Sequence, residues 1–192
     1  YPGGKLSHFS LVNYQFDAGP SLFTQPQNIE ELFQLANEPM EAYFTYQSLP
    51  ISFKYFFEDG TIVNAYTNQQ KLIQEFKEKL GEDENAIKAY LQQSEKVYNN
   101  IGKLFLNFSL HKTATLFKAP ILKAIAATKF KHLFRTMNQV NKASFSNAKT
   151  VQLFNRYATY NGSSPYKAPG MLTLIPHLEL NEGTFYPNGG MI

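Results

Sequence analysis

Residues 67–81 read TNQQKLIQEFKEKLG, and in this stretch the hydrophobic period of the chain changes. Apolar side chains recur there at helical spacing, and glycine at position 81 is a typical helix end. The apolar positions are Leu72, Ile73, Phe76 and Leu80. The same spacing continues from Ile87 to Ile101 and predicts a second, longer helix. Further helices are expected at 147–157 and 169–180, and two helical pieces at 114–135.

Before residue 67 the chain alternates apolar and polar residues in short runs, which is typical of strands. We expect strands at 6–9, 14–16, 44–46, 51–57 and 61–66, with a hairpin turn at Asp59-Gly60. Asn28 is expected to cap a short helix from Ile29 to about Ala36. The tail, 183–190, predicts strand and turn. The pattern favours an α+β fold, with short antiparallel or mixed strands and a predominantly helical insertion, in three segments: 1–66, 67–155 and 156–192.

Composition excludes several classes of protein. The chain has 192 residues, of which 43% are hydrophobic, 15% aromatic and 17% charged, so intrinsic disorder is not expected. It has no cysteine, which excludes a disulfide scaffold, a thiolate metal site and a cysteine nucleophile. No apolar run approaches the roughly 18 residues of a membrane span.

The net charge of +3 conceals a strong segregation of charge. Residues 1–95 hold 13 acidic and 6 basic residues, whereas 96–178 hold 12 basic residues and no acidic one. Lysines interleaved with apolar residues at 112–135 predict a helix that lies in a bilayer interface. A solvated basic face or core packing are the open alternatives. Nucleic acid is not favoured as a partner, because only Arg135 and Arg156 supply arginine in this region.

Residue patterns alone indicate no catalytic site. The four histidines lie far apart in the sequence, so no metal site is expected, and neither G-x-S-x-G nor a Walker loop occurs. Paired carboxylates at 58–59 and 82–84 are interpreted as turn formers and helix-start residues. The glycine turns at 3–4, 19, 162 and 189–190 would allow a ligand to approach the backbone closely.

Four ordered motifs resemble those of bacterial phytoene desaturases, which are FAD-dependent carotenoid dehydrogenases in the flavin amine-oxidase-like group. FDAGPS (16–21) with NIEELFQLA (28–36) resembles an early segment of that family, and PGGK (2–5) its Pro-Gly-Gly-Arg turn with lysine for arginine. FNRYATYNGSSPY (154–166) resembles its central block, and YPNGGM (186–191) a later turn. The RYATY wording is similar to the hydroxycarotenoid 3,4-desaturase branch.

The resemblance implies a role for each motif. It implies that Gly3, Gly4 and Lys5 lie near the ribose and pyrophosphate of FAD. Asp17, Gly19 and Pro20 would lie beside the flavin, with Gly189, Gly190 and Met191 on a loop that returns to it. The substrate side would be lined by Arg156, Tyr157, Tyr160, Asn161, Gly162 and Pro165. For Arg156 and the tyrosines, core and interface packing is the alternative. No residue is identified as a proton-transfer catalyst.

The parent enzyme implied by this resemblance introduces conjugated double bonds into a carotenoid through FAD. The chain contains no G-x-G-x-x-G, the turn on which dinucleotide binding rests. We therefore expect a substrate-binding fragment that by itself neither binds FAD tightly nor desaturates anything. We expect the parent protein to be cytoplasmic and to associate peripherally with membrane through 112–135. The alternative is a non-enzymatic, basic lipid-binding or interaction module.

Overall fold

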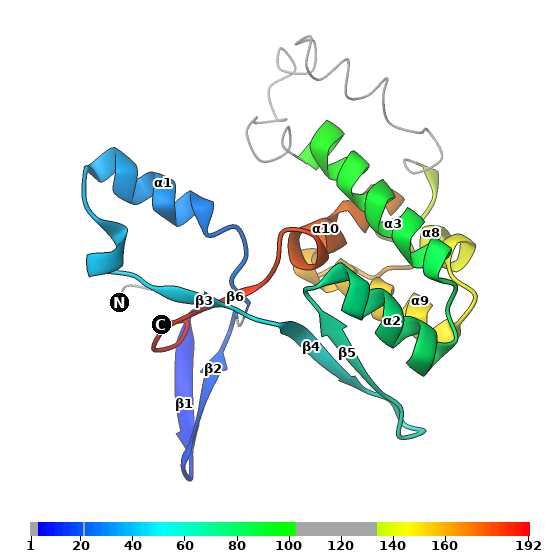
Figure 1. Cartoon of the computed structure of the whole chain (residues 1–192), viewed down its shortest axis with the longest axis horizontal. Helices are drawn as coiled ribbons and strands as arrows, with labels where there is room; N and C mark the ends of the chain where they lie inside the picture. The colour runs from blue at the N-terminus through cyan, green and yellow to red at the C-terminus, as the bar shows by residue number, and fades with distance from the viewer. Residues whose placement is uncertain (1–3, 21, 103–133) are drawn as a thin grey trace.

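The structure is a computed structural model that describes residues 4–20, 22–102 and 134–192. The described chain forms two parts (Figure 1). One part contains the first hairpin, the first helix and the final strand. The other part is a helical bundle with a second hairpin against it.

Short strands pair in three two-stranded sheets. The hairpin β1 (Ser7–Leu11) and β2 (Tyr14–Ala18) places Phe9 opposite Phe16. β3 (Tyr46–Ser48) pairs with β6 (Phe185–Pro187), and β4 (Ile51–Phe56) with β5 (Ile62–Tyr66). All three described pairs are antiparallel. The α+β fold class is confirmed, although β3 begins two residues later than expected.

Helix α1 (Gln27–Ala36) corrects one prediction from the sequence. Asn28 was expected to cap this helix, but the helix begins earlier, at Gln27, with Pro26 in the N-cap position and no side-chain cap. The αR backbone of Pro26 allows the helix to begin before Asn28. After α1, a single 3-10 turn, η1 (Met40–Ala42), leads into β3.

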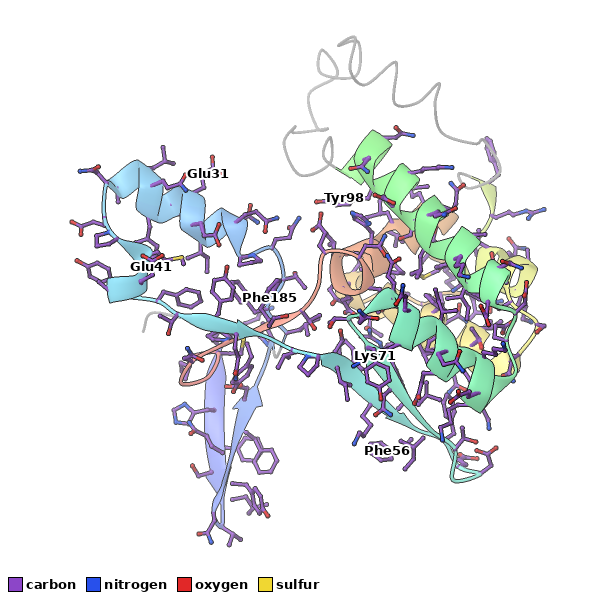
Figure 2. The ribbon with its side chains drawn as sticks, in the orientation of Figure 1. Glu31, Glu41, Phe56, Lys71, Tyr98 and Phe185 are labelled. Atoms are coloured by element: carbon purple, nitrogen blue, oxygen red, sulfur yellow. The ribbon has the colours of Figure 1, made fainter. Side chains whose placement is uncertain are left out.

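An aromatic cluster joins the strands of the first part. Phe23, Phe44, Tyr46 and Phe185 meet largely edge to face, with ring centroids 5.4 to 6.3 Å apart. Figure 2 shows Phe185 where β6 lies against β3. The hydroxyl of Tyr46 donates to Glu30 Oε1 at 2.6 Å and ties α1 to this cluster. Aromatic pairs of this kind stabilise beyond the area that they bury.

The helices that open the bundle follow their sequence signals. In α2 (Gln69–Leu80) the side chain of Asn68 accepts from the backbone N–H of Lys71, and Gly81 ends the helix at φ 65°. Asp83 caps α3 (Glu84–Val97) in the same way. The expected continuation to residue 101 exists, but as a π-helical turn, η2 (Tyr98–Gly102).

The later helices are more broken than the periodicity predicts. The helix expected at 147–157 is α9 (Ala148–Asn155) followed by a 3-10 helix, η3 (Arg156–Asn161). The helix expected at 169–180 begins as the 3-10 helix η4 (Gly170–Leu174) and becomes α10 (Ile175–Leu180). Helix α8 (Met137–Ser144), with a capping box between Thr136 and Gln139, was not predicted.

One hydrophobic core joins the bundle. Its members come from β5, α2, α3, α8, α9, η3 and α10, and include Val63, Leu72, Phe76, Ile87, Leu91, Met137, Phe154, Tyr157 and Leu180. The β4–β5 hairpin packs on α2, so part of segment 1–66 and part of segment 156–192 share this core with the central helices. By contrast, α1 has no buried residue.

Among the described residues, no helix is both long and apolar enough to cross a membrane. Nearly all of the segment 112–135, for which interfacial helices were predicted, lies outside the described residues.

Candidate functional site

The motifs at the two ends of the chain meet at Asp17. Its Oδ2 accepts a hydrogen bond of 2.7 Å from the hydroxyl of Tyr186, and its Oδ1 accepts one of 3.2 Å from the backbone N–H of Met191. Gly190 lies beside the same carboxylate, where an added Cβ would come within 3.4 Å of Oδ1. The hydrogen bond to Asp17 raises the pKa of Tyr186. Both carboxylate oxygens are thus occupied in holding the loop 186–191.

The backbone carbonyl of Lys5 lies directly against Gly19. A Cβ on Gly19 would lie 2.3 Å from the carbonyl oxygen of Lys5, and the φ of Gly19 is 120°. Only glycine fits there, because of the neighbouring backbone. We call this place the Asp17 corner, made of Gly4, Lys5, Asp17, Gly19, Gly189, Gly190 and Met191. Exposed Pro20 follows it in sequence, and Gly3 lies outside the described residues.

The Asp17 corner leaves backbone open to a ligand. Nothing lies within 4 Å of a Cβ built on Gly4 or Gly189, and both have positive φ, of 56° and 99°. A bulky planar group such as a flavin could therefore approach the backbone closely at these two glycines. The residues present fit one wall of such a site.

A second group of predicted residues gathers around Glu179, whose side chain is completely buried. Arg156 Nη2 lies 2.8 Å from Glu179 Oε2, and Arg156 Nε donates to the hydroxyl of Tyr55 at 2.9 Å. The guanidinium also lies 3.9 Å from the ring centroid of Phe53. Tyr160 donates to the other oxygen of Glu179. We call this set the Glu179 cluster: Phe53, Tyr55, Arg156, Tyr157, Tyr160 and Glu179.

Charges in the Glu179 cluster are set by burial and by each other. Burial raises the pKa of Tyr55 to about 12, against the opposing effect of the Arg156 charge. Burial and then the carboxylate of Glu179 raise the pKa of Tyr157 and of Tyr160. Burial opposes the charge on Arg156, but its neighbours outweigh this and raise its pKa. At neutral pH the cluster therefore holds a charged arginine among neutral phenols.

The remaining predicted residues lie around this cluster. Asn161 and Gly162 form the exposed end of η3, where Gly162 has φ 60°. Pro165 lies with Arg156 in the wall of a groove. Sequence reasoning missed Glu179 and Tyr55. The acid-free stretch ends at Glu179, which marks this residue in the sequence but does not identify its partner.

The groove is open to solvent, has a volume of about 810 Å³ and lies along α8 and α9. We call it the α8–α9 groove. Its walls come from these two helices, from η3 and from the loop before η4. The residues that line it are Asn138, Lys142, Phe145, Ser146, Ala148, Val151, Gln152, Asn155, Arg156, Thr159, Pro165 and Tyr166.

Metal ligands do not converge in the part of the chain that the structure describes: no three histidine, aspartate or glutamate side chains there are grouped to hold an ion. The one buried histidine among the described residues, His177, packs against Tyr98 with ring centroids 4.7 Å apart and ring planes tilted by 35°.

Known proteins are similar to the chain over almost its whole length. The chain is 47% identical, over 191 residues, to 1-hydroxycarotenoid 3,4-desaturase from Flavobacterium sp. (strain P99-3). The match covers 100% of the chain and 39% of that protein. The chain is homologous to a segment of the carotenoid desaturases. The resemblance that the motifs indicated is confirmed.

Two less similar relatives also match almost the whole chain. The chain is 27% identical over 190 residues to 4,4'-diaponeurosporene oxygenase from Staphylococcus haemolyticus (strain JCSC1435). This match covers 98% of the chain and 37% of that protein. It is 29% identical over 191 residues to the protein of the same name from Staphylococcus aureus (strain MRSA252). That match covers 98% of the chain and 38% of the relative. No family model matches the chain. The chain spans less than half the length of the desaturase and of both oxygenases.

Proposed function

We propose that this chain is the substrate-binding part of an FAD-dependent carotenoid desaturase, an enzyme that introduces conjugated double bonds into a polyene. The observation that carries the proposal is the identity of 47% to a hydroxycarotenoid desaturase across the whole chain. The Asp17 corner agrees with it, because the terminal motifs that resemble this family are hydrogen-bonded to each other there across 169 and 174 positions.

In this proposal the Asp17 corner forms one wall of the FAD site. When bound, oxidised FAD supplies the hydride acceptor, and the protein supplies orientation. Gly4, Lys5 and Gly189 would lie against the cofactor with open backbone. Asp17 holds Met191 and Tyr186 in place, so the loop 186–191 has a defined position before any ligand arrives.

The substrate side would be the surface around η3. Arg156 and Pro165 line the α8–α9 groove there, while Tyr157, Tyr160 and Glu179 lie behind Arg156. The buried carboxylate keeps the guanidinium in one position at the groove wall. In this proposal Arg156 would have both the substrate-side role and the packing role.

Membrane contact through 112–135 is part of the same proposal. A polyene dissolves in the bilayer, and lysines interleaved with apolar residues combine headgroup attraction with insertion. Flotation of the chain with vesicles tests this. Anionic vesicles should carry the chain upward and neutral ones should not, whereas equal binding to both, or to neither, contradicts the electrostatic contact.

A chimeric enzyme tests the activity. Residues 1–192 replace the matching segment of the Flavobacterium desaturase, and the chimera is produced in cells that supply a 1-hydroxycarotenoid. We expect a pigment with longer conjugation by chromatography and absorbance. A chimera that folds, binds flavin and leaves the substrate unchanged would contradict the proposal. The isolated chain is expected to be inactive.

A further inference from the structure

The α8–α9 groove carries hydrogen-bond donors that no described residue of the chain accepts from. Its lining includes two basic residues, Lys142 and Arg156, and no aspartate or glutamate. Arg156 is already paired with Glu179, but no carboxylate pairs with Lys142 within the described residues. The groove therefore has one unneutralised positive charge.

A directed chain of hydrogen bonds leads from the core to this groove. The buried hydroxyl of Tyr90 donates to Asn141 Oδ1 at 2.7 Å. Asn141 Nδ2 then donates to Asn155 Oδ1 at 2.9 Å, and Asn155 Nδ2 donates to Asn138 Oδ1 at 2.9 Å. In each of these three hydrogen bonds the residue nearer to Tyr90 is the donor, so all three donate toward Asn138. Such chains polarise their members cooperatively in a low-dielectric interior.

The chain of bonds ends on an unused donor. Asn138 is only 8% exposed and lines the groove. Within the described part of the molecule, nothing accepts a hydrogen bond from its Nδ2. That nitrogen is not among the buried polar atoms that lack a partner, so solvent reaches it. Because Asn138 is held by Asn155 Nδ2 and by its own backbone N–H on the carbonyl of Pro165, this donor is preorganised.

The second donor lies one helical turn away. Lys142 follows Asn138 by four residues on α8, so both side chains leave the helix on the same side. The lining of the groove also includes the apolar side chains of Phe145, Val151 and Ala148. Its volume of about 810 Å³ lies within the range of roughly 300 to 1,000 Å³ that small-molecule sites have.

We propose that the α8–α9 groove binds the carboxylate end of an elongated apolar molecule. One carboxylate oxygen accepts from Asn138 Nδ2 and the other from the ammonium of Lys142, while the apolar tail lies against Phe145 and Val151. Two donors matched to two oxygens favour a carboxylate, and the charge of Lys142 disfavours a neutral alcohol. This site is separate from the Asp17 corner. It shares Arg156 and Pro165 with the surface proposed for the substrate side, but its two anchoring donors, Asn138 and Lys142, are not part of that proposal, and the inference rests on them.

Titration of the full chain with laurate, followed by calorimetry, tests the proposal. We expect saturable binding of one laurate. Lys142→Gln should weaken it about tenfold, the loss expected for one charge-assisted hydrogen bond. Lys96→Gln is the matched control: it makes the same change of charge at an exposed site on α3 outside the groove, and should leave binding unchanged.

A second variant removes the side-chain donor of Asn138 while it keeps the acceptor that binds Asn155. Asn138→Asp keeps an acceptor for Asn155 Nδ2 but removes the donor and adds a negative charge, so it should abolish laurate binding. Dodecanol should bind at least tenfold more weakly than laurate. Equal weakening by Lys142→Gln and Lys96→Gln, or equal binding of dodecanol and laurate, would overturn the proposal. If Asn138→Asp does not fold, the two lysine variants decide.

Discussion

Glu179 is the residue whose removal should destabilise the fold most sharply for its size. Its carboxylate is completely buried and serves both Arg156, at 2.8 Å, and the hydroxyl of Tyr160. The side chain of Arg156 is only 24% exposed, so water can replace the lost partner only in part. Replacing Glu179 by leucine would leave a guanidinium largely buried without a counter-charge.

The expected size of this effect follows from burial. Breaking a buried ion pair on one side costs about 3 to 5 kcal/mol, because the remaining charge is uncompensated. Replacing both partners, as in Glu179→Leu with Arg156→Met, should cost less than Glu179→Leu alone, since no buried charge remains. The free energy of unfolding is measured by urea denaturation, followed by circular dichroism because the chain has no tryptophan.

An exposed pair provides the control. Lys149 and Asp59 also form an ion pair, but the side chain of Asp59 is 56% exposed, so Asp59→Asn should leave the urea midpoint nearly unchanged. The reasoning is refuted if Glu179→Leu costs less than about 1 kcal/mol, or if the double variant is less stable than Glu179→Leu alone.

Other perturbations test other parts of the structure. Gly19→Ala would place a Cβ 2.3 Å from the carbonyl oxygen of Lys5 at φ 120°, so it should lower the free energy of unfolding by about 1 to 3 kcal/mol in the same assay. Because the pKa of Tyr55 rises from 10.0 to about 12 on folding, its contribution to stability is complete below pH 10 and is lost as the pH rises through 12. An alkaline titration of tyrosinate absorbance should lose a late phase in Tyr55→Phe, and an unchanged curve would refute this. Burial opposes the charge of Glu82, but hydrogen bonds from the backbone N–H groups of Ser146 and Asn147 outweigh burial and lower its pKa. Its stabilisation is present above pH 4.5 and is lost as the pH falls through the lowered pKa, so Glu82→Gln should cost about 1 to 2 kcal/mol at pH 7 and nothing in acid; an equal cost at both pH values would contradict the assignment.

Local sequence signals predicted the first helices of the bundle well. Gly81 and Asp83 end and begin helices through backbone geometry and a side-chain cap, both of which depend on neighbours in sequence. Asn28 failed as a cap because Pro26 starts α1 two residues earlier. Helix α8 was missed because its eight residues include only two large apolar side chains, Met137 and Val140, and its start depends on the capping box of Thr136.

The candidate site likewise contains some residues that the sequence could identify and some pairings that only the structure shows. The resemblance named Asp17, Gly190 and Met191, and the structure brings them together: Met191 donates a hydrogen bond to Asp17, and Gly190 lies beside the same carboxylate, in a contact that no local pattern contains. Glu179 could not be assigned to Arg156 from sequence, since the pairing joins η3 to α10 across 23 residues. The donor chain that ends at Asn138 was equally hidden, because it links three asparagines on two helices to Tyr90 on a third.

The flavin content of the purified chimeric desaturase tests the central claim most directly. Gly189→Val places a side chain in the open space of the Asp17 corner, where the wild-type glycine has φ 99° and no atom within 4 Å of its Cβ position. Gly60→Val is the matched control, since Gly60 has φ 81° and equally open surroundings in the β4–β5 turn. We predict stoichiometric flavin absorbance in the unmodified and Gly60→Val chimeras and its loss in Gly189→Val. Full flavin content in a folded Gly189→Val chimera would contradict the placement of the cofactor at this corner.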